Sequence, residues 1–163
     1  MRKKLFLLCL PAFMLWVSCS KSLPDYGTTP TVNMSNGWWV TLNLGNVAYT
    51  PPVFLSTYNT SENPDSMWVD DLKNGYGFKC KAKVDYSHLT FSATNVGNSY
   101  FVNTTAFPAS VTLLNGKILR KAGHSKAGNM TDSIYMQAVF SDDPGDTWTI
   151  AGTARTGFIE DDY

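Results

Sequence analysis

Two histidines are the bases that a serine hydrolase could use in this 163-residue chain. A serine becomes a nucleophile only beside a base that takes its proton, so His88 or His124 would have to fill that role. His124 precedes Ser125, but the segment 123–127, GHSKA, lacks the last residue of a nucleophile elbow and the flanking strand and helix. His88 lies at a predicted strand junction, where an exposed histidine without a task is common. A hydrolase is therefore only an alternative interpretation.

Paired carboxylates could serve a glycosidase as acid and base. Adjacent residues of a strand point to opposite faces, so only carboxylates distant in sequence could cooperate. The acidic residues at 142–146 are typical of a turn, and those at 160–162 are typical of a solvated tail. The clusters are Asp70-Asp71, Asp142-Asp143 with Asp146, and Glu160-Asp161-Asp162.

The chain has three cysteines, and their positions predict no disulfide. Cys9 falls in the N-terminal apolar segment and Cys19 at its end, which leaves Cys80 without a partner. We expect Cys80 to be a small core residue. No spacing of histidine and cysteine suggests zinc, and no acidic segment has the spacing of a calcium loop. The sequence thus predicts neither a metal nor a cofactor.

Aromatic residues are the most conspicuous candidates for ligand binding. Trp38 and Trp39 are neighbours on a predicted strand, so one ring should face inward and the other outward. The outward ring, with Trp68 in a predicted polar loop and Tyr58 nearby, could offer a surface to a lipid or a sugar. Core packing would account for most of these rings equally well.

Arg155 is the remaining candidate ligand-binding residue. It lies on the last predicted strand among threonines, where its guanidinium could meet the carboxylate of a ligand. It could also pair internally with Asp70 or Asp71, and we favour the internal pair.

A period of two in hydrophobicity dominates the chain after Gly37 and indicates β-strands. It is clearest in residues 76–86, 38–44 and 134–140, where apolar residues alternate with polar ones. No segment has the periodicity of an amphipathic helix. Asn115-Gly116 predicts a tight hairpin, and residues 142–146 predict the last turn. Weaker strands are expected at 53–60, 89–95, 100–105, 110–114, 117–121 and 147–158.

Short turns between about eight strands predict an all-β, antiparallel up-and-down barrel, since closure hides the apolar face and removes exposed edges. A barrel of this size holds either side chains or one small ligand. The small residues Ala82, Ala93 and Ala138 could leave a cavity, or could accommodate large neighbours such as Trp38 and Trp148. The sequence does not decide between an open and a filled barrel.

The N-terminus is typical of a bacterial lipoprotein. Basic residues 2–4 precede an uncharged stretch too short to span a bilayer, which predicts a signal peptide over 1–18. Ser18 before Cys19 resembles a lipobox, although Trp16 departs from its usual aliphatic residue. We expect a lipidated Cys19 with a flexible tether over 19–36, and a single domain over 37–163. An ordinary signal peptide cut near Ser18 is the alternative.

Several segments together resemble the family of bacterial lipoproteins called lipid-binding putative hydrolases. They are GWWV at 37–40, TYNTSENPDSMWVDDL at 57–72, DSIYMQAVFSDD at 132–143 and AGTARTGFIEDDY at 151–163. The resemblance implies a calycin-like, lipocalin-like barrel on a lipidated tether, with a lipid-binding role. It supplies no set of catalytic residues.

The predicted function is binding of a lipid or another apolar small molecule in the calycin-like barrel, without catalysis, by a protein anchored in the cell envelope. The anchor would lie in the outer membrane, facing the periplasm or the surface. Without residues 1–18 the chain has 13 − 3 = 10 basic residues against 13 acidic ones, a net charge of −3, which argues against nucleic acid. An accessory subunit contacting an envelope protein is the main alternative.

Overall fold

The computed structural model describes residues 29–102 and 105–163. Cys19 and the predicted signal peptide lie outside the described residues. A short 3-10 helix, η2 (Val32–Met34), precedes the strands, and another, η3 (Ile159–Asp161), follows them. The strands are β1 (Asn36–Leu44), β2 (Val47–Ala48), β3 (Val53–Asn59), β4 (Ser66–Asp70), β5 (Lys79–Asp85), β6 (Thr90–Gly97), β7 (Ser110–His124), β8 (Met130–Phe140) and β9 (Asp143–Ala154).

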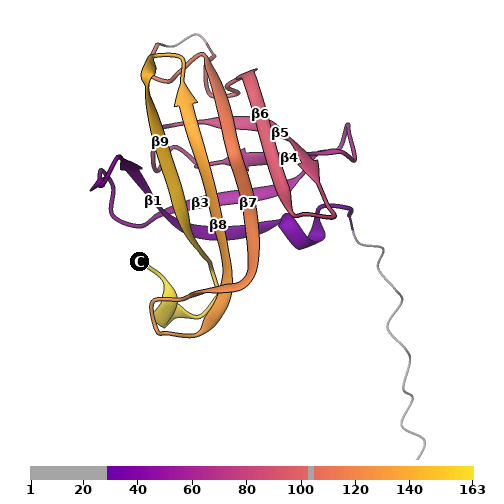
Figure 1. The fold of residues 1–163 in the computed structure, drawn as a ribbon, viewed down its shortest axis with the longest axis vertical. Helices are drawn as coiled ribbons and strands as arrows, with labels where there is room; N and C mark the ends of the chain where they lie inside the picture. Colours follow the sequence, from indigo (N-terminus) through magenta and orange to yellow (C-terminus); the bar gives the residue numbers. More distant parts are fainter. Residues whose placement is uncertain (1–28, 103–104) are drawn as a thin grey trace, which may run out of the picture.

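The strands form one antiparallel sheet that closes on itself. From β3 to β9 each strand pairs with the next, and β9 pairs with β1 to close an eight-stranded barrel. The two-residue β2 pairs with the end of β1 that β3 leaves free. In Figure 1, β7, β8 and β9 stand side by side, while β3, β4 and β5 cross behind them. The predicted all-β, up-and-down barrel is confirmed.

The barrel interior is filled by side chains. Twenty-three hydrophobic residues form one buried cluster, which includes Trp38, Phe78 and Phe140. The strands alternate inward and outward residues as the period of two predicts, most regularly in β8. Ala138 lies directly opposite Trp148 across β8 and β9, so the small residue accommodates the large ring.

The predicted hairpin at Asn115-Gly116 is wrong, because β7 runs through it as one strand. Leu114 and Lys117 of β7 pair with Gln137 and Tyr135 of β8, so three steps on one strand face two on the other. Asn115, which has φ +53°, lies in the β-bulge that accommodates the extra residue of β7. Asparagine tolerates this left-handed conformation in turns and bulges alike, so the dipeptide alone cannot tell them apart.

Other element boundaries also differ from the sequence prediction. The strand expected over 76–86 begins only at Lys79, and β4, expected to be a loop, is a strand. The described residues of 100–105 form no strand. The last turn is shorter than expected, since Phe140 pairs directly with Asp143. The packed chain also extends before Gly37, with the side chain of Met34 fully buried.

Candidate functional site

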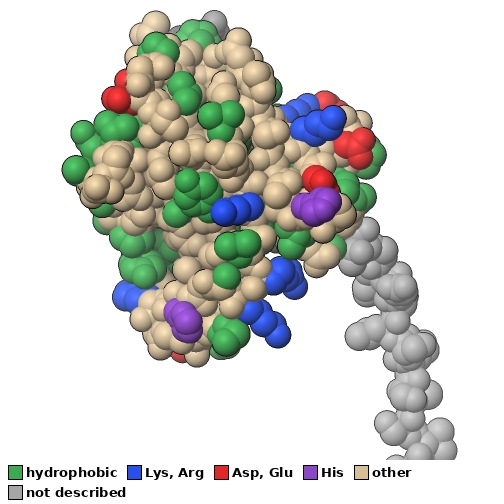
Figure 2. All heavy atoms as spheres, viewed as in Figure 1, with side chains coloured by type: hydrophobic (Ala, Val, Ile, Leu, Met, Phe, Trp, Pro, Cys, Tyr) green, Lys and Arg blue, Asp and Glu red, His purple; other side chains and the backbone are tan. Residues whose placement is uncertain are grey.

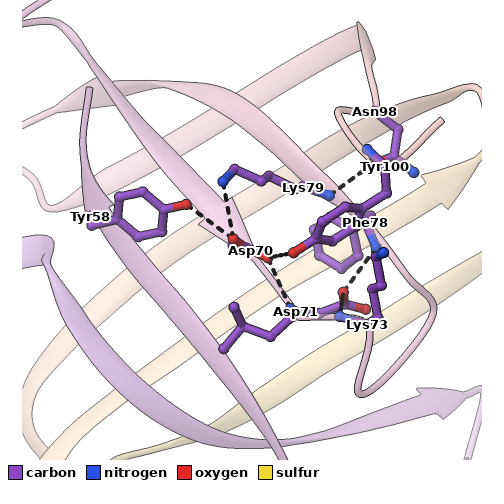
Figure 3. Close-up of polar contacts among 9 residues, drawn as sticks. Tyr58, Asp70, Asp71, Lys73, Phe78, Lys79, Asn98 and Tyr100 are labelled. Atoms are coloured by element: carbon purple, nitrogen blue, oxygen red, sulfur yellow. Dashed lines mark hydrogen bonds and ion pairs between the residues drawn. The ribbon is translucent and has the colours of Figure 1, made fainter. Parts of the chain in front are cut away.

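Asp70 ends β4 and lies at the centre of a polar cluster on the outer side of the barrel wall (Figure 3). It is only 2% exposed. The hydroxyls of Tyr58 and Tyr100 donate to it at 3.0 and 2.6 Å, and Figure 3 shows them approaching from opposite sides. The backbone N–H of Leu72 donates at 2.9 Å, and Lys79 Nζ lies 3.5 Å away. Asp70 therefore has four donors, one of them charged.

Asp71, the first residue after β4, points the other way and is fully buried. Its carboxylate accepts backbone N–H groups from Lys73 and Phe78 at 2.9 Å and from Gly77 at 2.7 Å. Burial raises the pKa of Asp71 above its ordinary value, because desolvation outweighs the three amide donors. These bonds draw residues 71–78 into a compact loop, which is why β5 begins later than its alternating pattern suggests.

Asn98 ties this loop to the one that follows β6. Its side chain accepts the N–H groups of Lys79 and Tyr100, and donates to the carbonyls of Gly77 and Pro108. Burial and the neighbouring Asp70 raise the pKa of Tyr100, so its hydroxyl stays protonated and remains a donor. Because Asp70 and its neighbour are both engaged, the cluster acts as a framework that holds two loops against the barrel.

Next to this framework, aromatic rings and lysines share the outer surface of β3, β4 and β5. Tyr58 pairs with Trp68, and Trp68 pairs with Lys81, so their side chains lie in one row. Lys79 Nζ lies 5.5 Å from the Tyr58 ring centroid and 5.1 Å from that of Trp68, and Lys81 Nζ lies 5.0 Å from Trp68. We call these four residues the aromatic–lysine face.

The remaining predicted aromatic residues lie elsewhere. Trp38 faces inward, is 1% exposed and donates its indole N–H to Thr57 Oγ1 at 2.8 Å. Trp39 faces outward and packs edge-on against Phe54 and Tyr163, with centroid distances of 5.5 and 5.6 Å. One tryptophan faces each side, as predicted, but the outward one lies apart from Trp68.

Arg155 pairs with Asp162, so the favoured pairing with Asp70 or Asp71 is wrong. Its Nε and one terminal nitrogen contact the two carboxylate oxygens of Asp162 at 2.6 and 2.5 Å. The backbone N–H of Arg155 bonds to Gly37, which places it beside β1. Strands β1 and β3 therefore separate it from β4.

His88 forms a small polar cluster that has the residues of a triad without its geometry. Its Nδ1 lies 2.9 Å from Ser87 Oγ and 2.8 Å from Asp85 Oδ2. A catalytic histidine contacts the serine with one ring nitrogen and the carboxylate with the other. Here both partners share one nitrogen in an exposed turn, which stabilises the turn. Figure 2 shows the two histidines (purple) far apart, so His124 cannot complete the set.

Sequence reasoning missed Tyr100 and Lys79 as parts of the cluster around Asp70. The alternation of lysines in residues 79–83 was a usable signal for a charged outer face, but nothing local links Tyr100 to Asp70, thirty residues away. Within residues 29–102 and 105–163, no group of three or more metal-ligating side chains gathers. No helix in the same ranges has the length and apolar character of a membrane span.

The sequence matches the family described as lipid-binding putative hydrolase over residues 23–159. The chain belongs to this family. The match covers most of the chain and all nine strands, so the family assignment and the barrel describe the same region. No curated protein matches the chain. The family description pairs lipid binding with hydrolysis, and the geometry of the described residues bears on each half separately.

Proposed function

We propose that this member of the lipid-binding putative hydrolase family is a membrane-anchored lipoprotein that binds a lipid without catalysis. The observation that carries the proposal is a filled barrel beside an amphipathic outer face. Since buried side chains occupy the interior, the ligand contacts the outside of the wall, and not a cavity inside the barrel as the sequence predicted. There the aromatic–lysine face offers rings to the apolar part of a lipid and ammonium groups to an anionic head group.

The lysines of this face can reach such a head group. Lys81 pairs with Glu62, but both side chains are well exposed, and exposed ion pairs contribute little stability. A phosphate or carboxylate can therefore replace Glu62. Lys79 is fixed by Asp70 and lies over both rings, so it presents a positioned cation next to Tyr58 and Trp68. Tyrosine and tryptophan suit this boundary because each has an apolar body and a polar tip.

The absence of catalysis is proposed from the state of the candidate acids and bases. Asp70 and Asp71 are engaged by protein donors, and His88 contacts its serine and carboxylate through the same nitrogen. None of them is poised to move a proton to or from a ligand on the aromatic–lysine face.

We propose that Cys19 carries the lipid anchor and places the protein in the cell envelope, at the outer membrane. The described chain begins at Thr29, ten residues after Cys19, so an extended tether would span at most about 35 Å. The domain would therefore stay close to the lipid surface. Labelling with radioactive palmitate should mark the protein, and C19A should remove both the label and the membrane fractionation. A labelled C19A would contradict the anchor.

Lipid binding is tested by native mass spectrometry of the chain from residue 20, which keeps every described residue, with lysophosphatidylglycerol as the probe. W68A should weaken binding about tenfold, or about 1.4 kcal/mol, because it removes the ring between the two lysines. W39A is the matched control, since Trp39 is an outward tryptophan away from this face. Equal losses in both variants, or none, would refute the assignment.

Catalysis is tested separately with p-nitrophenyl esters of increasing chain length. We expect no turnover above the buffer rate. Turnover that H88A or H124A abolishes would establish a hydrolase instead.

A further inference from the structure

A second, distinct feature of the outer wall is an open groove of about 730 Å³ across β5, β6, β7 and β8. Its lining includes Lys83, Thr90, Ser92, Lys117 and Tyr135. The groove lies beyond the aromatic–lysine face and shares no residue with it. Strands β7 and β8 belong to the layer that stands in front in Figure 1, and Figure 2 shows most acidic side chains (red) toward the margins of this view and one beside a histidine (purple).

The bulge in β7 shapes the groove. Leu114 and Asn115 both point outward, and the chain turns back inward at Gly116. A Cβ atom at Gly116 would lie 2.5 Å from the carbonyl oxygen and the ring of Phe91, so only glycine lets β6 approach β7 this closely. The irregular pairing on both sides of β7 bends the wall here.

The strand register places the groove's functional groups in a row. Asp85 pairs with Thr90, Thr90 with Lys117, and Lys117 with Tyr135, so these four outward side chains cross four strands in order. Three strand spacings of about 4.8 Å give a row of about 14 Å. Beside it, Lys83 pairs with Ser92. The row combines a carboxylate, a hydroxyl, an ammonium and an aromatic ring.

The two lysines are the groove's positive charges. Among the described residues, neither Lys83 nor Lys117 has a carboxylate within ion-pair distance, and Lys117 Nζ lies 5.1 Å from the Tyr135 ring centroid. Asp85 lies at the end of the row and forms no ion pair with either lysine; its oxygens accept from Ser87 and contact His88. The groove therefore presents two unpaired cations beside hydroxyl groups and a ring.

We propose that this groove binds an acidic saccharide. The lysines would meet its carboxylate groups, the hydroxyls of Thr90 and Ser92 would exchange hydrogen bonds with its hydroxyls, and the Tyr135 ring would contact a sugar face. The elongated row suits an oligosaccharide better than a single ion. This site is independent of the proposed lipid binding, since none of its residues belongs to the aromatic–lysine face.

The test is isothermal titration calorimetry of the mature lipidated chain in nonionic detergent, with tetragalacturonate, maltotetraose and inorganic phosphate as separate probes. We expect saturable binding of tetragalacturonate that weakens as salt is added. K83Q/K117Q should weaken it at least tenfold, and Y135A should weaken it more than Y135F, which keeps the ring. K73Q/K121Q is the control, because it removes the same charge outside the groove and should leave binding unchanged.

Three results would overturn the proposal. Equal binding of maltotetraose would show that the charge plays no part, and phosphate binding as tight as that of tetragalacturonate would show a simple anion site. Equal loss in K83Q/K117Q and K73Q/K121Q would show that net charge, rather than the groove, attracts the ligand. Circular dichroism of each variant separates a loss of binding from a loss of fold.

Discussion

Replacing Gly152 with alanine should destabilise the barrel by about 3 to 5 kcal/mol, because this glycine lies where β9 closes onto β1. It pairs with Val40 of β1 and Ile134 of β8. A Cβ atom there would lie 1.9 Å from the carbonyl oxygen of Trp39 and 2.7 Å from Val40 Cα. These are backbone atoms, so no side chain can rotate away. An ordinary contact begins at 3.4 Å, so the strands must separate by 3.4 − 1.9 = 1.5 Å.

A separation of that size breaks the hydrogen bonds between the two strands locally. An N···O distance that is ordinarily about 2.9 Å would lengthen well beyond hydrogen-bond range. Two or three lost bonds at about 1 kcal/mol each, with about 1 to 2 kcal/mol of packing strain, give the stated magnitude. Urea unfolding followed by tryptophan fluorescence measures the change in free energy of unfolding.

G145A is the matched control in the same strand. A Cβ atom at Gly145 would meet no heavy atom within 4 Å, so alanine there should be neutral or stabilise by about 0.4 to 1 kcal/mol. The two alanine variants should thus differ by about 4 kcal/mol. If G152A is as stable as G145A, β1 and β9 do not approach as closely as the structure shows, and the reasoning fails.

Two further predictions concern titratable groups. Hydrogen bonds from Ser125 and Thr156 hold the pKa of Asp161 down at about 2, so the folded state binds fewer protons than the unfolded state between about pH 4 and 2. Stability should therefore fall as the pH drops through that window, and D161N should flatten the fall; an unchanged pH profile of unfolding would contradict the assignment. Burial raises the pKa of the Cys80 thiol to about 12, so in the chain from residue 20 it should react with Ellman's reagent only in denaturant, and rapid labelling of the native protein would contradict its place in the core.

The sequence determines the barrel more firmly than its details, because alternation depends only on which face of a strand is buried. The inward and outward positions of β1 and β8 follow it directly. Residues 71–78 depart from it, since the amide bonds to Asp71 fold them into a loop while Phe78 still reaches the core. The side chain of Phe78 is buried as predicted although the segment is not a strand, because a hydrophobic side chain can reach the core from a loop as well as from a strand.

The surface sites could not be predicted from the sequence, for a different reason. Tyr58 and Trp68 were recognisable as candidates from residue type, but Asp85, Thr90, Lys117 and Tyr135 are each an ordinary outward residue within their own strands. Only the pairing of four strands brings the latter together, and the bulge at Asn115 shifts that pairing by one residue. A regular hairpin at the same dipeptide, as the sequence suggests, would have split β7 and removed the row. Whether the row exists thus depends on whether one asparagine forms a turn or a bulge, and the close approach of Gly116 to Phe91 that accompanies the bulge is a contact between strands that local preference does not reveal.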